Sequence, residues 1–206
     1  MATDVSDSAY RTAVMVHGST CSGKNVVADW AHANGFAVYE MGLVVREYWP
    51  ASHPGHGLTE AQIRDLLRVK QQDGTFRAPL GVLHFLYEHI SKNPKPTKDG
   101  VVFIIDVVSP EERTAIHARH QQAYGIAVHC SPEDREARVR LRQQKTGRVT
   151  DIDKRLKWEQ AMRLEEVMAA AELRLASAGT SADHLESFEK VVDAEMKNFL
   201  QKILTR

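Results

Sequence analysis

Continuously apolar runs alternate with amphipathic segments along most of the chain. Val101–Ile105 is the purest run, and it is preceded by a glycine and followed by the acid Asp106. A run of four to eight apolar residues between turn signals is typical of a strand that is buried on both faces. The pattern predicts strands at Thr12–His17, Phe36–Met41, Val101–Asp106, Gly125–Cys130 and Glu172–Ser177.

Helix signals stand between the predicted strands. Ser109-Pro110 and Ser131-Pro132 each supply an N-capping serine and a proline at the first helical position, with acidic residues in the first turn. The expected helices are Gly23–Asn34, Leu43–Trp49 (ended by Pro50), Thr59–Gly74, Leu80–Ser91, one that starts at Ser109, Ser131–Arg142, Asp153–Ala171 and a terminal helix near Leu185. Strands that alternate with helices predict a doubly wound α/β fold, a three-layer α/β/α sandwich around a parallel sheet of about five strands.

Composition is that of an ordinary globular protein and disfavours several classes. The 27 Lys and Arg residues balance the 27 Asp and Glu residues, so a general polyanion-binding role loses weight. Two cysteines, Cys21 and Cys130, are too few for a disulfide framework and favour a reducing cytoplasm. The longest apolar runs are far shorter than the roughly 20 residues that cross a membrane. We therefore expect a cytoplasmic protein without a membrane segment, whose polar N-terminus is neither a signal nor a transit peptide.

A glycine-rich segment joins the first predicted strand to the first predicted helix. Its residues are Gly18, Ser19, Thr20, Cys21, Ser22, Gly23, Lys24 and Asn25, and they match the phosphate-binding pattern G-x-x-x-x-G-K-[ST] except at the last position. In this pattern the backbone N–H groups and the helix N-terminus bind phosphate oxygens, while the lysine reaches the β- and γ-phosphates. The segment predicts ATP binding, with Lys24 as a catalytic residue. Asn25 replaces the hydroxyl that normally binds Mg²⁺, and we expect its amide oxygen, or a water that it holds, to take that place.

Asp106 stands at the C-terminal end of the third predicted strand. Ligands gather at this edge of a parallel sheet. A carboxylate there can hold Mg²⁺ through water or polarise an acceptor, so Asp106 is expected to be both a metal ligand and a catalytic residue. The alternative is an aspartate that only caps a turn or a helix.

The densest group of arginines follows the fourth predicted strand. Arg138 and Arg142 share one helix face, and Arg148 comes just after the turn at Gly147. Planar guanidinium groups suit the spread charge of a transferring phosphoryl group. We expect residues 138–155 to form a lid in which these three arginines act in catalysis. The alternative is a solvated helix with surface ion pairs.

Two further arginines are expected to contact the acceptor. Arg46 lies just beyond the second predicted strand and is placed to clamp an acceptor phosphate, unless it pairs with Glu47 or another surface acid. Arg77 lies in the next helical region and is a candidate contact to the base or sugar of an acceptor.

With these motifs the chain resembles the P-loop nucleotide kinases. The likeness is greatest to the branch of dephospho-CoA-kinase-like, archaeal adenylate-kinase-like and phage deoxynucleoside monophosphate kinases. It covers about residues 12–195 and rests on Gly18–Asn25, Met41–Glu47, Ile105–Glu112 and the arginine-bearing helix after Ser131-Pro132.

The resemblance implies a domain plan and a set of partners. A flexible segment at residues 1–11 would precede one P-loop kinase domain at residues 12–206, with an acceptor-binding insertion at residues 43–95 and the lid at 138–155. Gly179 falls in the segment that closes over the adenine. The cofactors would be ATP and Mg²⁺, and the acceptor a small-molecule nucleotide, with a nucleic acid acceptor left open. The protein would be a monomer or a homodimer.

Three departures from the family pattern bear on the acceptor. Leu43 stands where the family often has Asp, Asn25 ends the loop motif, and Asp106 is not followed by Gly-x-Arg. Losing the Asp removes a general base, which a hydroxyl acceptor needs more than an anionic phosphate does. A (deoxy)nucleoside monophosphate is therefore favoured. Two other hypotheses stay open: a hydroxyl acceptor, either dephospho-CoA or a hydroxymethylpyrimidine in DNA, and a nucleotide-binding regulator without turnover.

Overall fold

A computed structural model of the chain describes residues 10–59, 62–63, 80–147 and 150–205. Within them five strands form one parallel sheet in the order β2-β3-β1-β4-β5. The strands are β1 (Thr12–His17), β2 (Ala37–Glu40), β3 (Val101–Ile105), β4 (Gln122–His129) and β5 (Leu173–Ala176). The first strand of the chain is therefore the central strand of the sheet, and it pairs with β3 and β4.

Burial on both faces of the sheet confirms the doubly wound α/β prediction. All the residues of β1 are buried. Ala13 and Met15 pack into the cluster on one face, whereas Val14 and Val16 pack into the cluster on the other. Successive side chains of a strand point to opposite faces. A continuously apolar run is therefore what a sheet with two covered faces requires.

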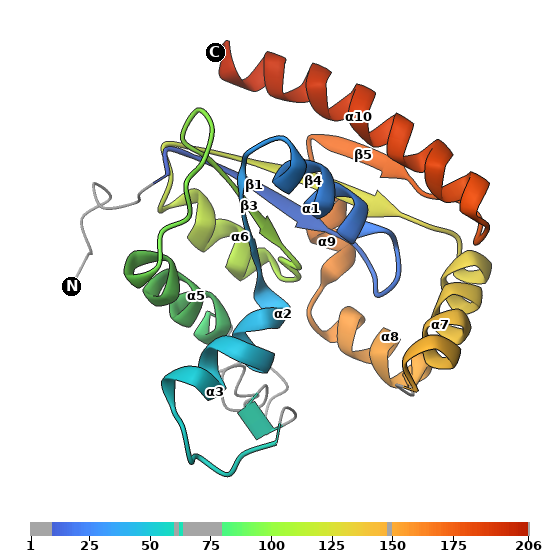
Figure 1. Cartoon of the computed structure of the whole chain (residues 1–206), viewed down its shortest axis with the longest axis horizontal. Coiled ribbons are helices and arrows are strands. Elements are labelled where there is room, and N and C mark those ends of the chain that lie inside the picture. The colour runs from blue at the N-terminus through green and yellow to red at the C-terminus, as the bar shows by residue number, and fades with distance from the viewer. Residues whose placement is uncertain (1–9, 60–61, 64–79, 148–149, 206) are drawn as a thin grey trace.

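Helices cover both faces of the sheet, as Figure 1 shows. On one face lie α1 (Lys24–Ala33) and α10 (Ala182–Leu204), which bury residues such as Val27 and Val192. On the other face lie α5 (Gly81–Lys92) and α6 (Pro110–His117), together with the segment that follows β2. The arrangement is the expected three-layer sandwich.

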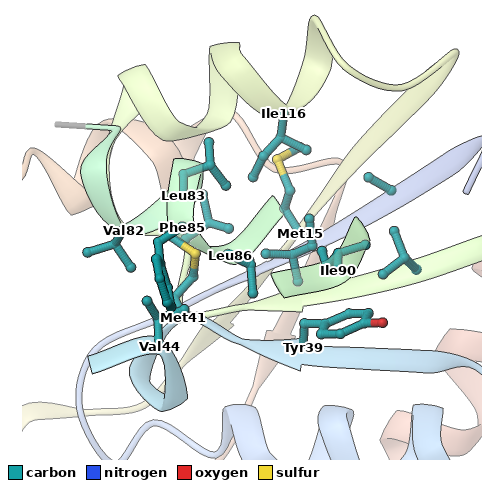
Figure 2. Close-up of a cluster of buried hydrophobic side chains, with 14 of the residues drawn as sticks. Met15, Tyr39, Met41, Val44, Val82, Leu83, Phe85, Leu86, Ile90 and Ile116 are labelled. Atoms are coloured by element: carbon teal, nitrogen blue, oxygen red, sulfur yellow. The ribbon is translucent and has the colours of Figure 1, made fainter. Parts of the chain in front are cut away.

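The hydrophobic cluster between the sheet and helices α5 and α6 includes the end of β2 (Figure 2). Met41 and Tyr39 share this cluster with Leu83 and Leu86 of α5, and all four are at most 1% exposed. Burial of a large apolar side chain contributes about 1.5–3 kcal/mol relative to exposure. This packing gives the residues that follow β2 a rigid base.

The segment after β2 enters helix at once. It consists of α2 (Met41–Leu43), a π-helical turn η2 (Val44–Tyr48) and α3 (Trp49–Ser52). Two expectations for it are wrong. Met41, expected to be the last residue of the second strand, is the first residue of α2, and Pro50 does not end a helix but lies in the first turn of α3. Proline is tolerated there because the first turn needs no N–H donor.

The polar part of the chain after β4 forms α7 (Pro132–Thr146), α8 (Ile152–Ala161) and α9 (Leu164–Ala169). The single helix expected for 153–171 is thus two helices. Arg163 separates them with a left-handed backbone (φ +57°), and its guanidinium pairs with Glu111 of α6. In Figure 1 the α2–α3 segment and the α7–α8 pair flank the C-terminal edge of the sheet.

Tyr10, two residues before β1, is 3% exposed and packs into the core; residues 1–9 lie outside the described part of the chain. The helix expected from Thr59 has a pair of capping hydrogen bonds at its start: the Thr59 N–H donates to Gln62 Oε1 at 2.8 Å, and the Gln62 N–H donates to Thr59 Oγ1 at 3.3 Å. Most of the helix expected beyond them lies outside the described residues.

In the described residues, helices long and apolar enough to cross a bilayer are absent.

Candidate active site

The glycine-rich loop lies at the C-terminal end of β1 and leads directly into α1. Gly18 and Gly23 have φ values of +154° and +105°. A Cβ on Gly18 would lie 2.5 Å from Ser22 Oγ and 2.6 Å from the Val128 carbonyl oxygen of β4. The loop therefore passes too close to itself and to β4 for any side chain at residue 18. The expected strand, loop and helix succession is present at this point.

Lys24 is folded back over the loop. Its Nζ donates to the carbonyl oxygens of Gly18 and Ser19, both at 2.8 Å, and lies 3.2 Å from Asp106 Oδ1. The Lys24 side chain is 8% exposed. The Lys24 ammonium group is therefore held between two loop carbonyl oxygens and the Asp106 carboxylate.

Asp106 directly follows β3 and turns back toward the loop. Its φ is +69°, and its backbone N–H donates to the Val16 carbonyl oxygen of β1 at 3.1 Å. The side chain stays one-third exposed beside Lys24. The sequence prediction that Lys24 and Asp106 share one site is consistent with this geometry.

The residues of the loop are suited to a phosphate chain and a divalent cation. Ser22 Oγ is buried and lacks a hydrogen-bond partner among the described residues, so it is a polar atom that a phosphate oxygen can satisfy. The Asp106 carboxylate and the exposed Asn25 amide are hard oxygen donors of the kind that Mg²⁺ prefers.

Arg46 approaches the same carboxylate from the α2–η2 segment. If residue 42 carried a Cβ, that atom would lie 3.0 Å from Arg46 Nη1 and 3.6 Å from Asp106 Oδ2. The absence of a side chain at residue 42 thus admits the guanidinium group. Arg77, the other arginine expected on this side, lies outside the described residues.

Glu40 is a site residue that the sequence analysis missed. It ends β2 opposite Ile105, one residue before Asp106. Burial, followed by the charge of Asp106, raises the pKa of the Glu40 carboxyl, while Arg46 lowers it. The family pattern often places a carboxylate at residue 43, where this chain has Leu. Glu40 provides a carboxylate three positions earlier, at the end of β2.

Arg138 and Arg142, the two expected lid arginines that the structure describes, lie in different surroundings. Arg138 donates two hydrogen bonds to the Gly179 carbonyl oxygen, from Nε at 2.9 Å and from Nη2 at 2.8 Å. Its Nη1 donates a third to the Cys21 carbonyl oxygen at 3.2 Å. It therefore joins the glycine-rich loop to the segment before α10. Arg142 instead donates to Thr150 Oγ1 at 3.0 Å within the α7–α8 pair, and is exposed. Arg148 lies outside the described residues.

Glu159 of α8 is a second residue that the sequence analysis missed. Its buried carboxylate accepts a hydrogen bond from the Thr20 N–H at 2.9 Å and from Arg155 Nε at 3.2 Å. Arg135 of α7 lies 3.7 Å from the other oxygen. An acid in a polar helix resembles a surface residue in sequence; its spacing of four from Arg155 was the one available signal.

His17 supports the loop from inside the sheet. It is fully buried, and its Nδ1 lies 2.8 Å from the Val107 carbonyl oxygen. Burial lowers the pKa of this imidazole to about 4, so it is neutral near pH 7. A neutral Nδ1–H donor fixes the turn after β3, and with it the position of Asp106.

Comparisons with known proteins show the fold and leave the chemistry open. A search of family models found no match. The chain is 24% identical over 197 residues to a UPF0200/UPF0201 protein of Archaeoglobus fulgidus, which covers 92% of this chain and 57% of that protein. The chain thus spans little more than half of this relative.

Two solved structures have a similar fold. TT1252 from Thermus thermophilus has a TM-score of 0.51 and 20% identity, with 90% of this chain and 98% of that chain covered. Shikimate kinase from Bacteroides thetaiotaomicron has a TM-score of 0.52 and 12% identity, with the same coverage. The five-stranded parallel sheet and its helices therefore share their overall fold with these two structures.

Proposed function

We propose that this protein is an ATP-dependent phosphotransferase whose glycine-rich loop binds the triphosphate. The position of Lys24 carries the proposal. Its ammonium group is buried among loop carbonyls and Asp106 at the N-terminus of α1, where backbone N–H groups and the helix dipole favour an anion. The fold shared with a shikimate kinase supports the same assignment.

In this proposal the chain supplies position and charge. Lys24 and the N–H groups of the loop hold the β- and γ-phosphates, while Asp106 and Asn25 hold Mg²⁺. The bound Mg²⁺ would neutralise phosphate charge. Phosphoryl transfer needs little covalent chemistry from the protein, so electrostatic stabilisation in a fixed geometry accounts for catalysis.

The acceptor that we favour is a (deoxy)nucleoside monophosphate. Arg46 supports it, because a guanidinium beside Asp106 and Gly42 is placed to bind an acceptor phosphate bidentately. A phosphate oxygen is already anionic at neutral pH, so this acceptor needs no base. The kinase branch that the motifs resemble remains part of this proposal.

Glu40 favours a second candidate, a hydroxyl acceptor such as dephospho-CoA or a hydroxymethylpyrimidine. A carboxylate with a raised pKa is suited to act as a general base. It would take the proton of the hydroxyl as the oxygen bonds to the γ-phosphorus and the bond to the β-phosphate oxygen breaks, releasing ADP. The argument that residue 43 lacks a base therefore does not by itself exclude this acceptor.

A transfer screen with γ-labelled ATP tests both candidates. The acceptors are the nucleoside monophosphates, dephospho-CoA and hydroxymethylated DNA, each with Mg²⁺. We expect label on a nucleoside monophosphate, and loss of that transfer in Arg46→Ala. Label on a hydroxyl acceptor, abolished by Glu40→Gln, would select the second candidate. ATP binding without transfer to any acceptor would leave only a nucleotide-binding regulator.

A further inference from the structure

The ammonium group of Lys24 is matched to as many oxygen atoms as it has donors. An ammonium group carries three N–H donors. Lys24 Nζ lies 2.8 Å from the carbonyl oxygens of Gly18 and Ser19. The third oxygen atom is Asp106 Oδ1, at 3.2 Å, and the Lys24 side chain is only 8% exposed. A phosphate oxygen can therefore accept a hydrogen bond from Lys24 only if one of these three contacts is given up.

The contact with Asp106 is the one that can open at the lowest cost. The two carbonyl oxygens belong to the loop, which is held tightly against β4: a Cβ on Gly18 would lie 2.6 Å from the Val128 carbonyl oxygen. The Asp106 contact is the longest of the three, and its side chain is one-third exposed. A carboxylate that turns away from Lys24 toward water keeps its hydration, whereas movement of a carbonyl would require the loop to rearrange.

The same contact also opposes an anion through its charge. The Asp106 carboxylate lies beside the Lys24 ammonium group and cancels much of the attraction that a phosphate would feel there. It also repels the phosphate directly. The ion pair thus occupies a donor that phosphate needs and keeps a negative charge at the N-terminus of α1, where an anion is otherwise favoured.

We propose that the ion pair between Lys24 and Asp106 is an autoinhibitory contact, which a nucleoside triphosphate must open before Lys24 binds its phosphates. This inference rests on the proposed function, because it requires a triphosphate in the loop. In that function Asp106 also holds Mg²⁺, so the metal and Lys24 compete for one carboxylate. A nucleotide that arrives without metal has to break the ion pair unaided, and the contact therefore selects against metal-free nucleotide.

Calorimetry on the full chain in EDTA tests the contact, with metal-free AMPPNP as the probe. Asp106→Asn keeps the shape of the side chain but removes its charge, so the ion pair is lost. We expect metal-free AMPPNP to bind about tenfold more tightly to this variant, as the loss of one charge-assisted hydrogen bond from the competing contact implies. An affinity that is unchanged or weaker would overturn the proposal.

A double-mutant cycle separates the ion pair from simple repulsion between Asp106 and the nucleotide. In Lys24→Met the ion pair is already absent. Adding Asp106→Asn to that variant should therefore change the affinity for metal-free AMPPNP by less than about threefold. A gain of about tenfold in this background as well would show that the carboxylate acts without Lys24, and would overturn the proposal.

Glu40→Gln is the matched control. Glu40 is near enough for the charge of Asp106 to raise the pKa of its carboxyl, but it forms no ion pair with Lys24 in the described structure. Its substitution should change the affinity for metal-free AMPPNP by less than about threefold. If Lys24→Met binds too weakly to be measured, this comparison decides, and equal gains in Asp106→Asn and Glu40→Gln would overturn the proposal.

The wild-type protein separates this inference from the proposed function. Failure to bind AMPPNP even with Mg²⁺ would refute the proposed function itself. Binding with Mg²⁺, together with no gain for metal-free AMPPNP in Asp106→Asn, would refute only the autoinhibitory contact.

Discussion

The candidate site has two halves that are built in different ways. The nucleotide half is the glycine-rich loop with Lys24, and the lid half is formed by Arg138 and Glu159. In the nucleotide half, Lys24 bonds to carbonyls only six and five positions earlier in the chain. In the lid half, Arg138 reaches Cys21 across 117 positions and Glu159 reaches Thr20 across 139. The first half is built on hydrogen bonds between residues close in sequence, to which the ends of β3 and β4 are added, and the second on long side chains that the fold brings in. The nucleotide half should therefore be the less tolerant of substitution.

Loss of the Lys24 ammonium group should have the largest effect. Lys24→Met keeps the aliphatic stem but removes the positive charge beside the phosphates, and should slow phosphotransfer by about 100- to 1,000-fold. The fold should persist, because Asp106 stays partly solvated. Initial rates with labelled ATP, together with circular dichroism spectra, measure both. A rate within threefold of wild type would show that the two halves do not differ as described.

A methyl group on Gly18 should cost both stability and binding. Gly18→Ala must displace Ser22 or the β4 carbonyl, at a cost of about 1–3 kcal/mol. Urea unfolding and AMPPNP calorimetry measure the two effects. Gly55→Ala is the control, because Gly55 also has a positive φ, of +81°, but open space around it. Equal nucleotide affinity in the two variants would contradict the close approach of the loop to β4.

The free energy of unfolding should depend on pH through His17, which lies next to the nucleotide half at the end of β1. The pKa of His17 is lowered from 6.5 to about 4 in the folded protein, so the unfolded chain binds the extra proton first. The contribution is complete above pH 6.5 and is lost as the pH falls toward 4, which removes about 2 kcal/mol between pH 7 and pH 5. Urea unfolding at both pH values measures it. The same pH slope in His17→Asn would refute the assignment to His17.

Removal of Arg138 should give the smallest of these effects. Arg138→Ala breaks the link between the loop and the Gly179 carbonyl and should raise the KM for ATP about tenfold, with a smaller change in kcat. Steady-state kinetics at saturating acceptor measure the split. Arg140→Ala removes an exposed arginine of the same helix and serves as the control. A fall in kcat with KM unchanged would move Arg138 from a bridging to a catalytic position.

The difference between the halves also explains what could be predicted from sequence. The loop motif and the burial of β1 follow from consecutive residues, so both were visible in the sequence. Glu40 was missed because Asp106, which raises its pKa, comes near it only after β2 pairs with β3. Glu159 was missed because a polar helix gives no indication of which acid is buried. The acceptor and the kinase branch stay predictions.

The errors in the predicted elements have a similar origin. Pro50 is a strong local stop signal, but it can occupy a first helical turn, and here the chain uses it that way. Arg163 carries no signal for a left-handed backbone; an ion pair with α6 accompanies it. Tyr10 lies in a polar segment, yet its hydroxyl meets Tyr39 at 3.0 Å inside the domain. For Arg163 and Tyr10, a contact distant in sequence accompanies the departure from the local preference.

The central place of β1 in the sheet has a consequence for how the protein is made. The loop rests on a strand whose two neighbours, β3 and β4, are synthesised long after it. Parallel pairing across such separations is slow, because a long loop must close before the contacts form. On the ribosome, the nucleotide pocket therefore cannot take shape until β4 has emerged, and a nascent chain that ends before residue 122 should hold no ATP analogue.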